Sequence, residues 1–170
     1  KIKSLCNKEK VSRKKDLNAF LKTGFPSKQN EDWKFTDLNA ILNKNFDEIT
    51  NNFEFVLNKK FKILEDFDHN YILLTNGALS KSDFNYEDEE KIKIKDFKNI
   101  NTVAPITKNN LTLLNKALTS GGYSLEVSDN YKFKKPLIIY NYFSENLKNV
   151  ILNNSNYIKL NKGSELTVVE

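Results

Sequence analysis

Few side chains in this chain of 170 residues could act in catalysis or hold a metal ion. Its one histidine, His69, lies in the polar segment Asp66-Phe-Asp-His-Asn70, and its one cysteine, Cys6, lies in a lysine-rich start. A Ser-His-Asp or Cys-His nucleophilic site would have to use His69, but no G-x-S-x-G elbow accompanies it. A metal site built on Cys6 and His69 would need two further ligands, and none has a recognisable spacing. We therefore expect His69 to be an exposed turn residue, and we expect no catalytic, cofactor-binding or metal-binding residue in this chain.

Loops that cradle phosphates are also missing, because the sequence contains neither G-x-x-x-x-G-K nor G-x-G-x-x-G. Carboxylates are numerous, but no pair has a spacing that marks it for acid–base catalysis. The single tryptophan, Trp33, is expected to anchor a core with its N–H bonded nearby, and stacking on a ligand is the alternative. These residues predict a protein that is not an enzyme.

The basic charge of the chain is weak evidence for a nucleic-acid partner. Lys and Arg total 27 against 22 Asp and Glu, a net charge of +5, but Arg13 is the only arginine. Proteins that read nucleic acids favour arginine, whose planar fork pairs with guanine and phosphate. Lysine, asparagine, isoleucine, phenylalanine and tyrosine share A/T-rich codons, so a nucleotide bias explains much of the lysine excess. We expect no nucleic-acid partner, and a basic nucleic-acid-binding domain is kept as an alternative.

Helix signals dominate the first part of the chain. Apolar residues at i, i+3 and i+4 predict a helix that Ser12 caps and that ends at Gly24, two residues before Pro26. Asn30, followed by an acidic pair, predicts a second helix start. Thr36 is predicted to cap another short helix.

Strand signals follow these helices. Asn76-Gly77 after an apolar run predicts a hairpin over residues 71–79. The alternation of lysine and isoleucine over residues 91–95 predicts a strand whose lysines face water. After one more helix, over residues 110–120, strands are expected over 123–127, 136–140, 150–152, 157–160 and 166–169. Their spacing of about 8 to 13 residues suits a sandwich, a barrel or a β-solenoid.

The two ends of the sequence lead us to expect an excerpt. The chain contains no methionine, even at position 1, and it stops inside a predicted strand. We expect both ends to be cut and the chain to be a fragment of a longer protein. No apolar run approaches 18 residues, so we expect no membrane span.

Three stretches resemble one protein family. Residues 24–36, Gly-Phe-Pro-Ser-Lys-Gln-Asn-Glu-Asp-Trp-Lys-Phe-Thr, resemble the signature G-[LF]-P-[ST]-x-x-x-E-[DN]-W-[KR]-[YF]-T near the start of SufD. SufD belongs to the SufB/SufD family of the iron–sulfur cluster assembly complex SufBCD, and this signature is typical of SufD rather than SufB. Residues 114–139 resemble the entry into the family core. Residues 157–170 are similar to the family pattern of a strand, x-x-G-[AS]-x, and then [LA]-T-V-[IV]-E.

The resemblance implies an α+β fold. Family members have a helical N-terminal region, a right-handed parallel β-helix and a helical C-terminal region. We therefore expect residues 1–120 to form the N-terminal helical or mixed region, which includes the small hairpin. Residues 121–170 are then expected to form the first turns of the β-helix, which would be incomplete.

The resemblance also implies a function: a non-catalytic scaffold subunit in iron–sulfur cluster assembly. Its implied partners are SufB and SufC, and the contacts to both lie mainly in parts of the family that this chain does not contain. The cluster-building residues of the family lie there too, so no residue is assigned a role and no cofactor is expected here. A generic protein-interaction module is the alternative.

Two further expectations concern assembly and place. An uncapped turn of a β-helix has unpaired strand edges and apolar rungs, so we expect self-association by edge pairing or swapping. The cytoplasm is the expected location, with a plastid or apicoplast as the alternative, because A/T-rich codon usage fits a streamlined bacterium and a plastid-bearing parasite.

Overall fold

The computed structural model describes residues 2–3, 10–46, 49–50, 62–97, 109–145, 147 and 149–170. The chain divides into two compact units. Unit 1 comprises Lys1–Phe53, Thr102–Thr119 and Asn146–Asn153, and unit 2 comprises Glu54–Asn101, Ser120–Glu145 and Asn154–Glu170. Each unit has a buried apolar cluster of its own. The expected division into residues 1–120 and 121–170 stays a prediction.

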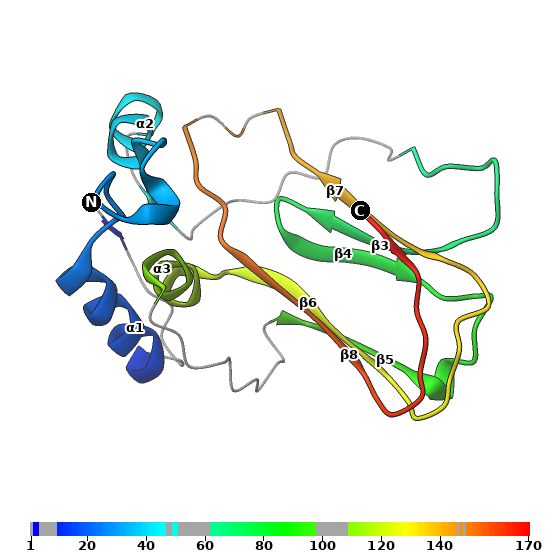
Figure 1. Cartoon of the computed structure of the whole chain (residues 1–170). Helices are drawn as coiled ribbons and strands as arrows, with labels where there is room; N and C mark the ends of the chain where they lie inside the picture. Colours follow the sequence, from blue (N-terminus) through cyan, green and yellow to red (C-terminus); the bar gives the residue numbers. More distant parts are fainter. Residues whose placement is uncertain are drawn as a thin grey trace. The chain divides into compact units, whose positions relative to one another are not determined.

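Unit 1 is built on two packed helices, α1 (Lys10–Thr23) and α3 (Asn110–Leu118), which lie side by side in Figure 1. Their shared core contains Phe20, Leu113, Leu114, Ala117 and Leu118. These positions recur at three and four residues along α3, which is the spacing of one helix face. The periodicity in the sequence therefore identified both helices.

The predicted start of α1 is wrong and its predicted end is right. The helix begins at Lys10, so Ser12 lies inside its first turn and not at the position before the helix. Gly24 has a φ of 68° and donates its N–H to the carbonyl of Phe20 at 2.6 Å. This left-handed conformation suits glycine and ends the helix.

The short helical segments of unit 1 differ in detail from the prediction. After Asn30 the chain makes a single 3-10 turn, η1 (Glu31–Trp33), and the Asn30 amide oxygen accepts from the N–H of Ser27 at 3.0 Å instead of capping that turn. The cap of α2 (Leu38–Asn45) is Asp37, which accepts from Ala40 N–H at 3.0 Å, and not Thr36. A pair of two-residue strands, β1 (Ile2–Lys3) and β2 (Ile49–Thr50), runs parallel.

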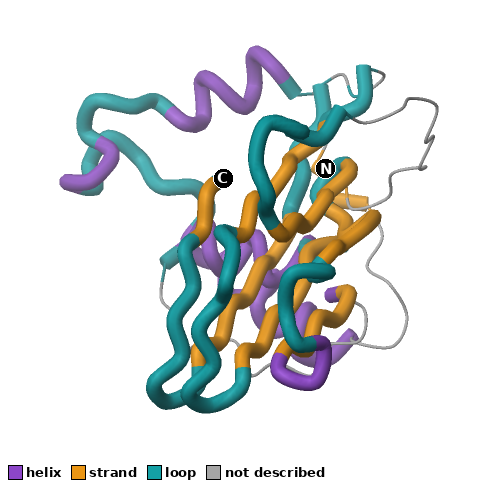
Figure 2. The backbone as a smooth tube through the Cα atoms, turned by 90° about the vertical axis from the view of Figure 1, so that its right-hand side faces the viewer, coloured by secondary structure: helices purple, strands orange, loops and turns teal. Residues whose placement is uncertain are grey.

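Unit 2 holds two small mixed sheets; Figure 1 labels most of their strands, and Figure 2 shows the strands in orange in a view turned by 90°. The first has the order β4-β3-β7-β9, and the second has the order β5-β6-β8. The strands of the first sheet are β3 (Asn70–Thr75), β4 (Ala78–Asp83), β7 (Leu137–Tyr142) and β9 (Val168–Val169). The strands of the second are β5 (Ile92–Asp96), which follows the 3-10 turn η2 (Glu89–Lys91), β6 (Gly121–Val127) and β8 (Asn154–Leu160).

Two strand predictions with local signals are confirmed. Asn76 and Gly77 have φ values of 51° and 81°, as a type I′ turn requires, and they join the antiparallel strands β3 and β4. In β5 the lysines are exposed, while Ile92 is buried and Ile94 is partly buried. The predicted strand over residues 150–152 is wrong, because no strand is present there.

The core of unit 2 is formed by the inward side chains of both sheets. Alternate residues along the strands share one face, which explains why every second residue enters the cluster. Its buried members are Ile72, Leu74, Ile92, Tyr123, Leu125, Val127, Leu137 and Ile139.

Along the chain, β6, β7, β8 and β9 alternate between the two sheets. β6 pairs in parallel with β8, and β7 pairs in parallel with β9. The α+β class is confirmed in its coarse form, as helices with two small mixed sheets, which do not by themselves make a β-helix. Within the described residues, no helix is long and apolar enough to cross a membrane.

Candidate functional site

The prediction that His69 is an exposed turn residue is wrong. His69 is only 8% exposed and lies directly before β3. Its Nδ1 lies 2.9 Å from the carbonyl oxygen of Phe67, and its Nε2 lies 2.9 Å from the hydroxyl of Tyr140 on β7. Because a carbonyl can only accept, Nδ1 carries the proton and a neutral ring accepts the Tyr140 hydroxyl at Nε2. The Tyr140 oxygen in turn accepts from the N–H of Leu64 at 3.2 Å.

The Nε2 bond to Tyr140 therefore holds the segment before β3 against β7, while the Nδ1 bond to Phe67 lies within that segment. The ring also packs among three aromatic rings: Phe67, Tyr140 and Tyr71, at centroid distances of 5.0, 6.0 and 6.4 Å. A catalytic base needs a ring nitrogen that faces a substrate. The two hydrogen bonds of His69 favour a structural role instead.

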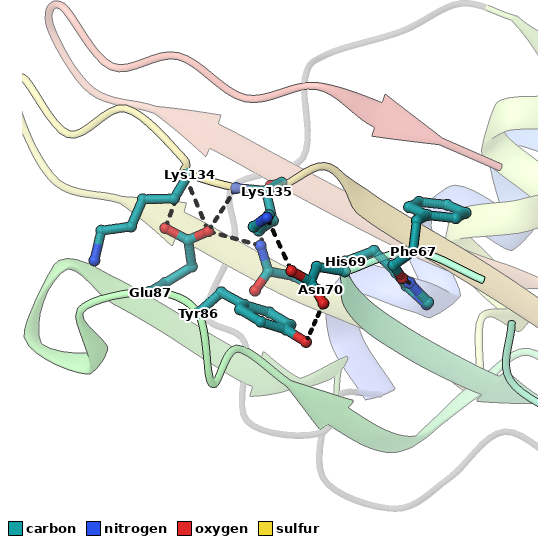
Figure 3. Close-up of polar contacts among 8 residues, drawn as sticks. Phe67, His69, Asn70, Tyr86, Glu87, Lys134 and Lys135 are labelled. Carbon is teal, nitrogen blue, oxygen red and sulfur yellow. Dashed lines mark hydrogen bonds and ion pairs between the residues drawn. The ribbon is translucent and has the colours of Figure 1, made fainter. Parts of the chain in front are cut away.

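The carboxylate of Glu87, shown in Figure 3, is buried and accepts several hydrogen bonds. It accepts from the side-chain amide of Asn70 at 2.8 Å and from the hydroxyl of Tyr131 at 2.8 Å. The backbone N–H groups of Lys134 and Lys135 also donate to it, each at 3.1 Å. Burial alone would raise the pKa of Glu87, but these hydrogen bonds outweigh burial and leave that pKa below its ordinary value.

A second, exposed cluster lies beside the first. Asp68 accepts from Lys135 Nζ at 3.0 Å and from the Tyr86 hydroxyl at 3.1 Å. The hydrogen bond from Lys135, followed by that from Tyr86, lowers the pKa of Asp68. The bond to Asp68 raises the pKa of Tyr86. Figure 3 shows His69 and Asn70 next to each other at the start of β3, with Tyr86, Glu87, Lys134 and Lys135 reaching them from other segments.

The hydrogen bonds around Glu87 and Asp68, which we call the clamp, favour a structural role for this arrangement. Glu87 already accepts four hydrogen bonds, which occupy the lone pairs that a metal ion or a substrate proton would need. In the described parts of the chain, no group of three or more His, Cys, Asp and Glu side chains could hold a metal ion. Cys6 lies outside the described residues.

Trp33 does not anchor a core in the part of the chain that the structure describes. It is partly exposed, and no residue of η1 is buried. Two residues further on, Phe35 is 91% exposed. Phe25, at the start of the SufD-like stretch, packs against Phe20 in the core of unit 1, whereas Phe35 lies at the surface, where a large apolar side chain gains little from folding.

Sequence reasoning missed the role of Glu87, which stands in a run of acidic residues, Glu87 to Glu90, and has no local mark that separates it from its neighbours. Three of its four donors come from residues more than forty positions later in the chain. Lys134 and Lys135 lie just before β7. The parallel pairing of β7 with β3 brings them to the loop that carries Glu87.

Comparison with known proteins connects the fold to a family. A search of curated proteins found no match. The model of the SufBD protein N-terminal region matches residues 3–139, which is well over half of the chain. The matched range contains α1, α2 and α3 and the clamp around Glu87. The chain therefore belongs to the SufB/SufD family, through its N-terminal region, and the family acts in iron–sulfur cluster assembly.

Proposed function

We propose that this chain is the N-terminal part of a SufD-type scaffold subunit of the SufBCD complex, with no catalytic role of its own. The observation that carries the choice of SufD over SufB is the stretch Gly24 to Thr36, which matches the SufD signature position by position. In the structure, Gly24 ends α1 and Pro26 is buried, while Phe35 is presented to solvent. The first residues of the stretch thus end a helix and pack inside unit 1, and its exposed aromatic side chain is suited to contact another protein.

We further infer that β6 to β9 are the first coils of a parallel β-helix. The support is a constant register: each residue of β6 pairs with the residue 33 positions later in β8, from Gly121 with Asn154 to Val127 with Leu160. β7 and β9 repeat this parallel pairing in the other sheet. A chain that visits two sheets in turn and then stacks on itself follows the plan of a solenoid.

The corners between these strands support the same inference. Asn130 and Gly163 both have left-handed backbones, with φ values of 57° and 70°, at equivalent positions of successive turns. Asn130 donates its N–H to the carbonyl of Lys162 at 2.8 Å, and Lys132 pairs with Glu165 just beyond the turn. The two corners therefore lie one on the other, as stacked coils require.

The partners that we propose are SufB and SufC, in keeping with family membership. The proposed location is the cytoplasm, with a plastid as the alternative. Self-association through strand edges is also a proposal, and light scattering that detects a clean monomer at high concentration would contradict it.

Two experiments test the proposed function. Co-expression of the tagged product of the full-length gene with SufB and SufC of the same source should give one complex on size-exclusion chromatography. The proposal fails if SufB and SufC elute together without it. To separate SufD from SufB, the gene should restore growth under iron limitation to a strain that lacks SufD, and not to a strain that lacks SufB. The reverse result would assign the chain to SufB.

A further inference from the structure

We propose that residues 70–96, which comprise the hairpin β3–β4 and the strand β5, form a cap that closes one end of the coil stack and prevents other extended chains from adding there. The proposal rests on the inferred coil arrangement of β6 to β9. It adds a role for the residues that come before the coils, which the scaffold function leaves without one.

The strand order places the cap at one end only. In the first sheet, β4 and β3 lie on the side of β7 that is opposite to β9, and in the second sheet β5 lies on the side of β6 that is opposite to β8. At this end both outermost described strands run antiparallel to their neighbours, whereas β8 and β9 run parallel to theirs. The reversal of direction ends the parallel stacking on this side.

The inner side of the cap covers the apolar interior of the first coil. Its buried residues Ile72, Leu74 and Ile92 belong to the same cluster as Leu125 and Leu137 of the coil. Three more cap residues are partly buried against this cluster: Leu79, Phe84 and Ile94. A terminal element of a solenoid must bury the last apolar layer in this way.

The outer side of the cap is polar. Ser80 and Lys81 of β4 are exposed, as are Lys93 and Lys95 of β5. β4 also pairs with β3 through a register irregularity between Leu73 and Leu74. Lysines, short strands and bulges are the means by which edge strands avoid pairing with other chains.

The opposite end of the coil stack, formed by β8 and β9, exposes apolar side chains instead of lysines. β8 and β9 carry four large apolar side chains that are between 39% and 51% exposed: Ile158, Leu160, Val168 and Val169. One end thus has exposed lysines over a covered core, and the other has exposed apolar residues in line with the core. The covered core and the exposed lysines of residues 70–96 are the observations that carry the proposal.

The test is the association state of the purified 170-residue chain. The double variant Lys93→Thr, Lys95→Thr removes the charge from the edge strand β5 and keeps a residue that favours strands. We expect its weight-average mass in sedimentation velocity to rise with concentration, toward at least twice that of the unmodified chain at the same concentration. A mass equal to that of the unmodified chain at every concentration would overturn the proposal.

Two matched variants separate edge protection from a general effect of charge. Lys134→Thr, Lys162→Thr removes the same charge from exposed positions outside the strands, and it should associate no more than the unmodified chain. Lys93→Glu, Lys95→Glu lowers the net charge twice as far but keeps β5 charged, so it should also resemble the unmodified chain. If both variants associate as the threonine variant does, net charge and not the edge governs association, and the proposal is wrong.

Circular dichroism checks that each variant is folded. If the threonine variant does not fold, Lys95→Thr alone is measured against Lys162→Thr under the same criteria. SufB and SufC are absent from these measurements. A failed cap proposal therefore leaves the scaffold function standing, and a failed co-elution with SufB and SufC leaves the cap proposal standing.

Discussion

The side-chain amide of Asn70 donates to the carboxylate of Glu87 at 2.8 Å, and this bond joins the start of β3 to the loop after β4. The same carboxylate accepts the backbone N–H groups of Lys134 and Lys135. Lys134 and Lys135 lie in the loop between β6 and β7, which is longer than the corresponding loop between β8 and β9 in the second proposed coil. Four residues separate Lys132 from Leu137, but only two separate their partners in the next coil. Glu87 thus accepts the backbone N–H groups of Lys134 and Lys135, for which the second coil has no residues in register.

The first prediction concerns Glu87→Gln. The amide keeps the size of the side chain but has one acceptor oxygen in place of two, so at least one of the four donors loses its partner. A buried donor without a partner costs about 1–3 kcal/mol, and we expect the free energy of unfolding to fall by that amount. Urea denaturation followed by circular dichroism measures the change.

The control for this prediction is Glu89→Gln, which alters an exposed carboxylate two residues away. Its effect should stay within about 0.5 kcal/mol, as for most surface substitutions. If the two variants have equal stabilities, the four bonds of Glu87 contribute nothing that the chain cannot replace with water.

The second prediction concerns acid. The folded state holds the pKa of Glu87 below its ordinary value of 4.5, so the carboxylate binds a proton less readily in the folded chain than in the unfolded chain. The stabilisation by this group is therefore complete above pH 4.5 and is lost as the pH falls through the lower folded pKa. We expect the urea midpoint of the unmodified chain to drop below pH 4.5 more steeply than that of Glu87→Gln.

Midpoints measured at several pH values between neutrality and about pH 3 test this expectation. Asp68 contributes in the same direction in both proteins, because its pKa is also lowered, so only the difference between the two slopes reports on Glu87. Parallel pH profiles for the two proteins would contradict the prediction.

The third prediction concerns Gly122 in β6. Its φ is 125°, and a Cβ added there would overlap the backbone carbonyl of Ser155 in the neighbouring strand β8. Neither backbone can move without breaking the parallel register of the two strands, so Gly122→Ala should lower stability by at least about 3 kcal/mol. The midpoint of thermal unfolding should therefore fall by at least roughly 6–12 °C.

Gly163→Ala is the matched control for the clash. Gly163 also has a positive φ, 70°, but the nearest atom to an added Cβ is in the side chain of Asn130, which can rotate. This variant should lose only the roughly 1–2 kcal/mol of the left-handed conformation. Equal losses for the two variants would show that conformation, and not the close approach of β6 to β8, explains the role of Gly122.

Much of the fold could be predicted because its signals are local. The period of α1 and α3, the Asn76-Gly77 turn and the alternation of β5 each depend on residues a few positions apart. The apolar triplet over residues 150–152 misled the prediction, since three residues do not reveal whether a neighbouring strand exists to pair with them. Asp37 and Thr36 are both good caps, and the sequence alone does not choose between adjacent candidates.

The clamp could not be predicted, because burial of a polar residue depends on distant partners. His69 is buried by Tyr140 and Glu87 is satisfied by Lys134 and Lys135, all brought near by the parallel pairing of β3 with β7. That pairing joins strands more than sixty residues apart in sequence, and no spacing rule connects them. From the sequence alone, His69 and Glu87 therefore could not be told apart from polar residues at the surface.

The last prediction concerns Tyr140→Phe. This change removes the hydroxyl that donates to Nε2 of His69 and accepts from the N–H of Leu64, and it leaves the packing of the ring in place. We expect a loss of about 1–2 kcal/mol in the free energy of unfolding. Tyr86→Phe removes an exposed hydroxyl bonded to Asp68, and it should cost less than about 0.5 kcal/mol. Nitrogen NMR at alkaline pH gives a second readout: His69 should be protonated at Nδ1 in both proteins, because the carbonyl of Phe67 still accepts from Nδ1, and the Nε2 resonance should shift in Tyr140→Phe. Protonation at Nε2 in the unmodified chain would contradict the bond to Phe67, because a carbonyl oxygen cannot donate.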